Sequence, residues 1–189
     1  EKGERLQALY DMSTLIAQAT TLDELATGFT QRIARVAHAD GVALRWADEG
    51  NQRYLLLASH GLPAVMAEQE QCLMAGDCHC GVPQAATGVR VIPIQALPQG
   101  SLAHCARADF ETVVALPIRL HERTMGELNL FYNAQVTPSE AERSLLETLN
   151  FKVGHHVFFA ESLDSFLDDV RRARPTVFGS VPRLWLKFR

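Results

Sequence analysis

TVVALPIRLHERTMGELNLFY, residues 112–132, contains two predicted β-strands joined by a short turn. Residues 112–120 are rich in β-branched and apolar side chains, which favour extended backbone. Residues 124–132 alternate, with Leu128 and Leu130 on one face of the strand. The segment 121–123 is short enough to close a tight hairpin. This stretch therefore predicts an antiparallel strand pair at the centre of the fold.

A second hairpin is predicted near the beginning of the chain. Apolar side chains alternate over residues 42–46 and again over residues 54–58, and the segment 49–51 between them has turn chemistry. Residues 90–94 form a further short apolar strand. Short helices are expected at residues 64–71 and 101–109. The sheet is thus built from antiparallel strands with small connecting helices.

Longer helices are predicted at both ends of this strand region. Residues 4–19 and a segment that begins after Thr21 carry apolar stripes at helical spacing, and Glu24 completes a capping box with Thr21. Residues 137–140, Thr-Pro-Ser-Glu, begin a helix that extends to about residue 149. The stripes predict core packing or a dimer seam. The element order predicts an α+β fold, an antiparallel sheet flanked by terminal helices.

Composition excludes several classes of protein. The 189 residues carry a formal net charge of −4, which gives no basic surface for nucleic acid. Hydrophobic residues make up 47% and charged residues 21%, as in ordinary soluble domains. No apolar run approaches the roughly 20 residues of a membrane helix, and no secretion leader is visible. We expect a cytoplasmic protein that binds neither nucleic acid nor membrane.

The 4 cysteines give the most specific chemical signal in the sequence. They are Cys72, Cys78, Cys80 and Cys105. Thiolates are good ligands for Zn²⁺ and iron–sulfur clusters and react readily with oxidants. In a cytosolic setting, clustered cysteines more often indicate metal or redox chemistry than structural disulfides. The tight spacing of Cys78 and Cys80 disfavours zinc, and the alternative interpretation is that the cysteines are buried small apolar residues.

Histidines and two polar strand residues are further candidates. His79 and His104 stand beside cysteines and are expected to be ligands or to lower thiol pKa values. His60, before Gly-Leu-Pro, faces a pocket or forms a turn. Glu127 and Asn129 lie off the apolar face of their strand, so they point either into a ligand cavity or to solvent.

The sequence resembles GAF domains, and within them the GAF module of nitrate/nitrite-type sensor histidine kinases. The resemblance covers about residues 4–150 and rests on quoted segments. These are HGLP (60–63), GDCHCG (76–81), CARADFETVVALPIRLHERTMGELNLFY (105–132) and TPSEAERSLLETL (137–149). It implies a sensory domain of residues 1–152 that dimerises through its terminal helices and signals to a histidine kinase in a two-component system.

Residues 153–189 are expected to form a separate tail. The segment 157–189, with ARPTVF followed by SVPRLW, resembles an internal piece of AMP-forming acyl-CoA synthetases. The phosphate-binding loop and catalytic domain of that family do not occur in the sequence, so we expect no synthetase activity. The apolar side chains of the tail predict that it continues the last helix or folds back on the domain or on a second chain.

The sequence thus predicts a non-catalytic sensory module with a cysteine-based site that reads redox state, a gas or a metal. An iron–sulfur cluster or zinc is the expected cofactor. The first alternative is a GAF domain that binds a small molecule between the sheet and the small helices, with idle cysteines. The second alternative is a thiol-based reductase.

Overall fold

The computed structural model describes residues 2–48, 50, 52–77, 88–94, 104–120 and 123–157. Its centre is a 6-stranded antiparallel sheet in the order β3-β2-β1-β6-β5-β4. The strands are β1 (Gly41–Ala47), β2 (Arg53–His60), β3 (Cys72–Met74), β4 (Arg90–Pro93), β5 (Thr112–Leu120) and β6 (Arg123–Tyr132). Both predicted hairpins are present, as β1–β2 and β5–β6.

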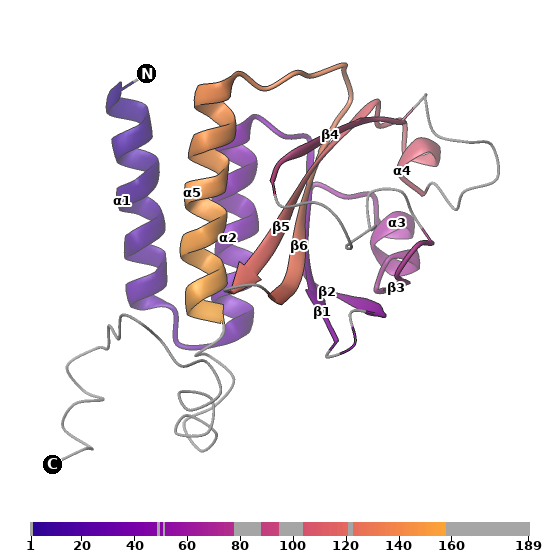
Figure 1. Cartoon of the computed structure of the whole chain (residues 1–189), viewed down its shortest axis with the longest axis horizontal. Helices are drawn as coiled ribbons and strands as arrows, with labels where there is room; N and C mark the ends of the chain where they lie inside the picture. Colours follow the sequence, from indigo (N-terminus) through magenta and orange to yellow (C-terminus); the bar gives the residue numbers. More distant parts are fainter. Residues whose placement is uncertain are drawn as a thin grey trace, which may run out of the picture.

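Helices cover the two faces of the sheet unequally. The long helices α1 (Lys2–Gln18), α2 (Leu22–Ala37) and α5 (Glu140–Val157) lie side by side on one side of the sheet (Figure 1). The short helices α3 (Ala64–Gln69) and α4 (His104–Arg107) lie on the other side. This arrangement confirms the predicted α+β class. None of the described helices is both long and apolar enough to cross a bilayer.

The main core lies between the sheet and the long helices. Leu44, Leu128 and Leu116 pair across β1, β6 and β5, so their side chains share one face of the sheet. All three pack in one cluster with Phe29 of α2 and Leu149 of α5, and all five are buried. Burial of such side chains is the dominant favourable term in folding, about 1.5–3 kcal/mol each. The central strands therefore fix α2 and α5 against the sheet.

Strand β1 is buried on both faces. The alternation of residues 42–46 predicts that one set of side chains is buried and does not assign the other set. In the structure, Ala43 and Arg45 are also buried, on the face opposite Leu44. Small helices cover this second face, so the side chain of Arg45 lies in the interior of the protein.

The capping motifs are close to those predicted. Thr21 Oγ accepts a hydrogen bond from the Glu24 backbone N–H at 3.1 Å, as expected of the first half of a capping box. The Glu24 carboxylate bonds the backbone N–H and hydroxyl of Thr20 instead of Thr21. At α5, the capping residue is Ser139 rather than Thr137. The Ser139 hydroxyl accepts a hydrogen bond from the Glu142 backbone N–H. The Glu142 carboxylate in turn accepts hydrogen bonds from the backbone N–H and the hydroxyl of Ser139.

Replacing Ser139 by alanine is expected to lower the free energy of unfolding by about 1 kcal/mol, because the first turn of α5 loses its capping oxygen. Urea denaturation of the purified protein measures this change. Ser144→Ala, at an exposed position within α5, is the control and should change stability by less than about 0.5 kcal/mol. Equal effects of the two substitutions would contradict the assignment of the cap.

The last helix continues through the predicted domain boundary at residue 152. Helix α5 extends to Val157, and residues 158–189 lie outside the described residues. The prediction for the tail therefore stays a prediction.

Candidate functional site

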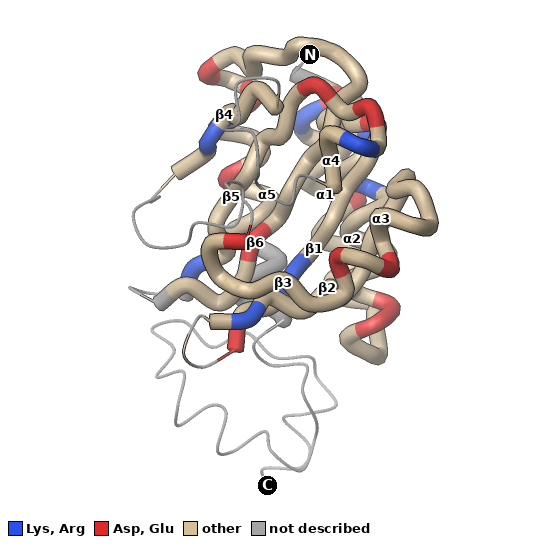
Figure 2. The backbone as a smooth tube through the Cα atoms, turned by 90° about the vertical axis from the view of Figure 1, so that its right-hand side faces the viewer, with Lys and Arg blue, Asp and Glu red and all other residues tan. Residues whose placement is uncertain are grey.

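Polar side chains occupy the centre of the sheet on the face that α3 and α4 cover. Cross-strand partners in a sheet share a face, so the pairs Arg45–Glu127 and Ala43–Asn129 of β1 and β6 lie together on it. Ala115 of β5 pairs with Asn129 and also with Arg90 of β4, which extends the polar row outwards. Figure 2 shows charged positions of the neighbouring strands β1 and β6 next to one another along the backbone.

Arg45 lies at the centre of this network, and 3% of its side chain is exposed. One terminal nitrogen of its guanidinium donates to Asn129 Oδ1, and the other donates to Glu70 Oε2. Glu70 is the first residue after α3 and is equally buried. The backbone N–H of Glu70 bonds the carbonyl of Met66 at 2.9 Å, which fixes the carboxylate at the helix end. Arg45 therefore ties α3 to the middle of the sheet.

Glu127 carries the second buried carboxylate. Its Oε1 accepts a hydrogen bond from Asn129 Nδ2 at 2.7 Å, and its Oε2 accepts one from Arg90 at 2.9 Å. Burial raises the pKa of Glu127, and the hydrogen bond from Asn129 and the charge of Arg90 oppose this rise only in part. A carboxyl group held in this way responds to any change in the charge beside it.

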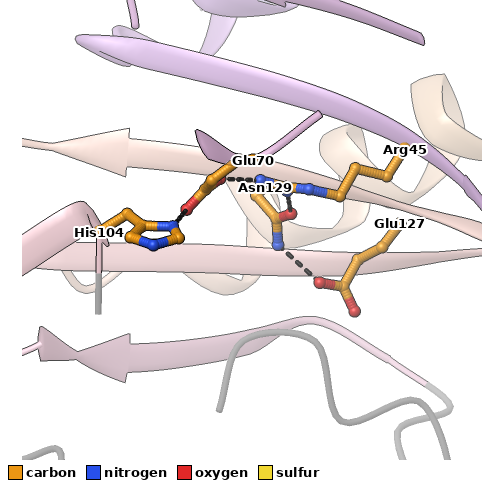
Figure 3. A network of polar contacts seen from close by, with 5 residues as sticks. All are labelled: Arg45, Glu70, His104, Glu127 and Asn129. Atoms are coloured by element: carbon orange, nitrogen blue, oxygen red, sulfur yellow. Dashed lines mark hydrogen bonds and ion pairs between the residues drawn. The ribbon is translucent and has the colours of Figure 1, made fainter. Parts of the chain in front are cut away.

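His104 adds the second of the two small helices to the network. It lies in α4, and its Nδ1 is 3.6 Å from Glu70 Oε1. The contacts therefore run from α4 through Glu70, Arg45 and Asn129 to Glu127 (Figure 3). Both small helices are thereby connected to polar groups on the central strands.

Besides His104 Nδ1, whose 3.6 Å contact with Glu70 is too long for a hydrogen bond, two further groups on this face have no hydrogen-bond partner within the part of the chain that the structure describes. They are Nε of Arg45 and the hydroxyl of Tyr54. Tyr54 is 2% exposed and pairs with Ala47, which lies on the same face of β1 as Arg45. Burial, with the charge of Glu127, raises the pKa of Tyr54 to about 12, so its hydroxyl is protonated at neutral pH. Buried groups of this kind usually have a partner.

The other half of the same face is apolar. Phe131 and Val113 pair across β6 and β5, and the Phe110 ring packs against Phe131 with centroids 5.2 Å apart. Met66 of α3 and Cys105 of α4 complete this cluster. The face therefore combines an aromatic and aliphatic half with a charged half.

This network of buried charged groups is an inefficient way to stabilise the fold. Removing a charged group from water costs several kcal/mol, which ion pairing often only offsets. Apolar side chains of similar size would serve the fold as well at these positions. Charged residues that are buried together, with hydrogen-bonding groups left over, are instead typical of functional sites.

The structure does not bring the two described cysteines together. Cys105 is 1% exposed in the apolar cluster under α4. Cys72 is exposed in β3, next to Leu73, whose side chain packs with Tyr54 on the α3/α4 face. Side chains alternate along a strand, so Cys72 lies on the opposite face. The sequence placed Cys72 in a loop, whereas it is part of an edge strand.

The remaining members of the predicted cysteine site are not described. Cys78, His79 and Cys80 lie outside the described residues. Among the residues that are described, no group of three or more histidine, cysteine or acidic side chains is placed to hold a metal ion. His60 is exposed at the end of β2 and pairs with Val42, which belongs to the helix-side core. Of the predicted ligand residues, His104 is the one that the described structure joins to the network.

Alkylation of the native protein by iodoacetamide at pH 7.5 is expected to label Cys72 and leave Cys105 unmodified. Burial raises the pKa of Cys105 to about 11, with a further rise from Glu70, so its reactive thiolate is scarce. Peptide mapping by mass spectrometry gives the extent at each residue. Denatured protein is the control, in which both cysteines should react. Rapid labelling of native Cys105 would contradict its buried placement.

Sequence reasoning found part of this network. The alternation of residues 124–132 places Glu127 and Asn129 off the apolar face, toward either a pocket or solvent, and the structure shows both buried. Arg45, Glu70 and Tyr54 were missed. A signal for Arg45 was available, because it is the charged residue within the otherwise uncharged strand sequence GVALRWA of residues 41–47.

Comparison with solved structures identifies the fold. The GAF domain of an Acinetobacter phosphoenolpyruvate-protein phosphotransferase matches with a TM-score of 0.65 and 22% identity, over 81% of this chain and 92% of that one. A domain of a putative two-component sensor histidine kinase from Sinorhizobium meliloti matches with a TM-score of 0.63 and 11% identity, over 78% and 97%. A phycoerythrobilin-bound GAF domain from a cyanobacterial phytochrome matches with a TM-score of 0.65 and 12% identity, over 81% of this chain and 93% of that one.

The chain therefore has the GAF fold, as its resemblance to that family predicted. No protein-family profile matches the sequence, and no curated protein matches it either.

Proposed function

We propose that this chain is a sensory domain that binds a small molecule on the α3/α4 face of its sheet, at the network of Arg45, Glu70, Glu127 and Asn129. The observation that carries the proposal is the network itself. Its charged groups are buried, connect two small helices to the central strands, and leave the Arg45 Nε and Tyr54 hydroxyl without partners among the described residues. The fold supports this role, since a solved neighbour holds a bilin.

The site is suited to binding rather than to catalysis. The protonated Tyr54 hydroxyl and the protonated Cys105 thiol are poor nucleophiles, since burial raises both pKa values. The carboxylate oxygens of Glu127 are already hydrogen-bonded to Asn129 and Arg90. We therefore favour a non-enzymatic module over a thiol-based reductase.

The central strands offer a direct route from this site to α5. Glu127 and Asn129 face the network, whereas their neighbours Leu128 and Leu130 pack in the helix-side core. Asn150 of α5 also donates a hydrogen bond to the carbonyl of Pro117 at 2.9 Å, and Pro117 pairs with Glu127. A ligand that shifts β6 would thus act on both sides of the sheet. Signalling needs two states of this element that the ligand binds differently.

We extend the proposal to the partners that the sequence predicted. A histidine kinase module is the proposed recipient of the signal, and a solved neighbour comes from such a kinase. Dimerisation through the terminal helices is supported by the exposed side chains of Leu6 and Tyr10 on α1 and Phe151 on α5.

A thermal-shift screen against a library of metabolites tests the proposal. Ligands of this site should raise the melting temperature of the wild-type protein and of Tyr132→Phe, whose hydroxyl bonds the Ala37 carbonyl away from the network. They should fail to raise that of the double variant Arg45→Met/Glu70→Met, which lacks the central ion pair. Hits that stabilise the double variant as well as the wild type would refute the proposed location.

The cysteine site is a second candidate, based on the close spacing of Cys72, Cys78 and Cys80 in the sequence. It predicts stoichiometric iron or zinc in protein purified without oxygen, and loss of that metal in Cys78→Ser. Elemental analysis and the visible absorption spectrum measure both. Metal-free protein under these conditions would reject this candidate and leave the small-molecule proposal intact.

A further inference from the structure

We propose that the ligand of this site is an uncharged, planar molecule that presents hydrogen-bond acceptors, such as carbonyl oxygens or ring nitrogens, to Arg45 and Tyr54. This inference rests on the proposed function and adds the chemical class of the ligand. It follows from which groups of the network already have partners, from the balance of charge, and from the apolar surroundings.

The hydrogen-bond inventory requires acceptors from the ligand. The oxygens of Glu127 accept from Asn129 and Arg90, and the amide oxygen of Asn129 accepts from Arg45. Glu70 Oε2 accepts from Arg45, whereas Oε1 lies 3.6 Å from His104 Nδ1, which is beyond hydrogen-bond distance. The described carboxylate and amide oxygens other than Glu70 Oε1 are thus engaged, whereas Arg45 Nε can only donate and the Tyr54 hydroxyl can donate. A ligand that satisfies Arg45 Nε must bring a lone pair, and Tyr54 can donate to a second one.

The two unpartnered groups are close enough along the sheet to contact one molecule. Arg45 pairs with Leu56, and Tyr54 lies two positions further along β2 on the same face. Diagonal neighbours of this kind are about 7–8 Å apart, which long side chains bridge. The charge of Glu127 also contributes to the raised pKa of Tyr54.

The charges of the network favour an uncharged ligand. Arg45 and Arg90 are paired with Glu70 and Glu127 respectively, so the positive and negative charges of these two ion pairs balance. An anion would gain one guanidinium N–H but would lie beside two buried carboxylates. A cation would find those carboxylates already occupied by arginine. Unbalanced charge in a buried site is costly, so neutral acceptors fit the site better.

The surroundings favour a planar, partly apolar body. The polar half of the face continues into the cluster of Phe110, Phe131, Val113 and Met66. Aromatic rings of this kind pack well against other flat rings, with a gain beyond burial alone. Small-molecule sites typically combine such an apolar lining with a few polar groups that fix orientation.

A matched pair of probes tests the inference. Nicotinamide carries a carbonyl oxygen and a ring nitrogen without net charge, and nicotinate replaces its amide by a carboxylate on the same ring. Each is titrated into ¹⁵N-labelled wild-type protein, with dissociation constants taken from NMR shifts of the network residues. We expect nicotinamide to bind about tenfold more tightly than nicotinate, because burying the nicotinate charge beside the two carboxylates is costly.

Two tyrosine variants show whether the contact is the one proposed. Tyr54→Phe removes a hydroxyl that has no described partner, so the fold should persist, and nicotinamide affinity should fall about three- to tenfold. Tyr132→Phe removes a buried hydroxyl that bonds Ala37 and should leave the affinity unchanged. Unchanged affinity in Tyr54→Phe would overturn the inference.

The outcomes separate this inference from the function on which it rests. Equal or tighter binding of nicotinate at the network overturns the uncharged class while supporting a small-molecule site there. Binding of neither probe at the network also overturns the inference. This result is expected if water alone satisfies the two donors. The library screen then tests the proposed function independently.

Discussion

Replacing Arg45 by methionine is expected to lower the free energy of unfolding by about 3–5 kcal/mol, measured by urea denaturation. The arginine lies between Glu70 and Asn129, and its loss leaves a buried carboxylate and a buried amide oxygen without their donor. An unpaired charge in this environment costs far more than the pair contributes, because water cannot reach the carboxylate to replace the guanidinium.

Two comparisons distinguish this effect from a general cost of losing an arginine. Arg53→Met removes the partner of Asp48 from a pair whose arginine side chain is 61% exposed, and it should cost less than about 1 kcal/mol. The double variant Arg45→Met/Glu70→Met removes both charges and should recover most of the lost stability. An Arg45→Met effect as small as that of Arg53→Met would show that the pair is accessible to solvent.

Gly126→Ala is expected to reduce stability by about 4 kcal/mol or more, among the largest effects of a single substitution. Gly126 lies in β6 opposite Trp46 of β1, and a Cβ there would be 2.1 Å from the carbonyl oxygen of Arg45. That atom belongs to the backbone of a central strand, so relief of the clash requires β1 and β6 to separate where the network is anchored. Thermal unfolding followed by circular dichroism measures the loss.

Gly3→Ala is the matched control for this substitution. A Cβ at Gly3 meets no described atom within 4 Å, and the residue lies in α1, where alanine is the better helix former. We expect a change within about 1 kcal/mol, toward higher stability. A Gly126→Ala protein as stable as the wild type would mean that β1 and β6 are not packed as closely as described.

The sequence was most informative where neighbours in the chain are also neighbours in space. The hairpin of residues 112–132 and its apolar face depend on local alternation and a short turn, and both are present as β5 and β6. Helix starts at Thr21 and near residue 138 likewise follow from local hydrogen bonding. These features need no knowledge of which distant strands pair.

The site depends on pairings that the sequence alone does not specify. Arg45 and Asn129 are separated by 84 positions, and they meet because β1 inserts beside β6 rather than at the edge of the sheet. Until that pairing is known, Asn129 and Glu127 are as consistent with solvent as with a pocket. Glu70 reaches Arg45 only because α3 folds back over the sheet (Figure 1).

The predicted cysteine site depends on local conformation as well as on spacing. Alternation along β3 directs Cys72 away from the face that buries Cys105. Cys78 and Cys80 lie outside the described residues, so the site itself stays a prediction. The histidine beside Cys105 joins the network through Glu70 rather than through sulfur.

The most direct test of a ligand site on the α3/α4 face is an amide NMR map of the wild-type protein with the strongest hit from the metabolite screen. The account predicts shift changes that concentrate at Arg45, Tyr54, Glu70, Glu127 and Asn129 and then extend to α5. Changes confined to α1 and the outer side of α5, with the network residues unmoved, would contradict it.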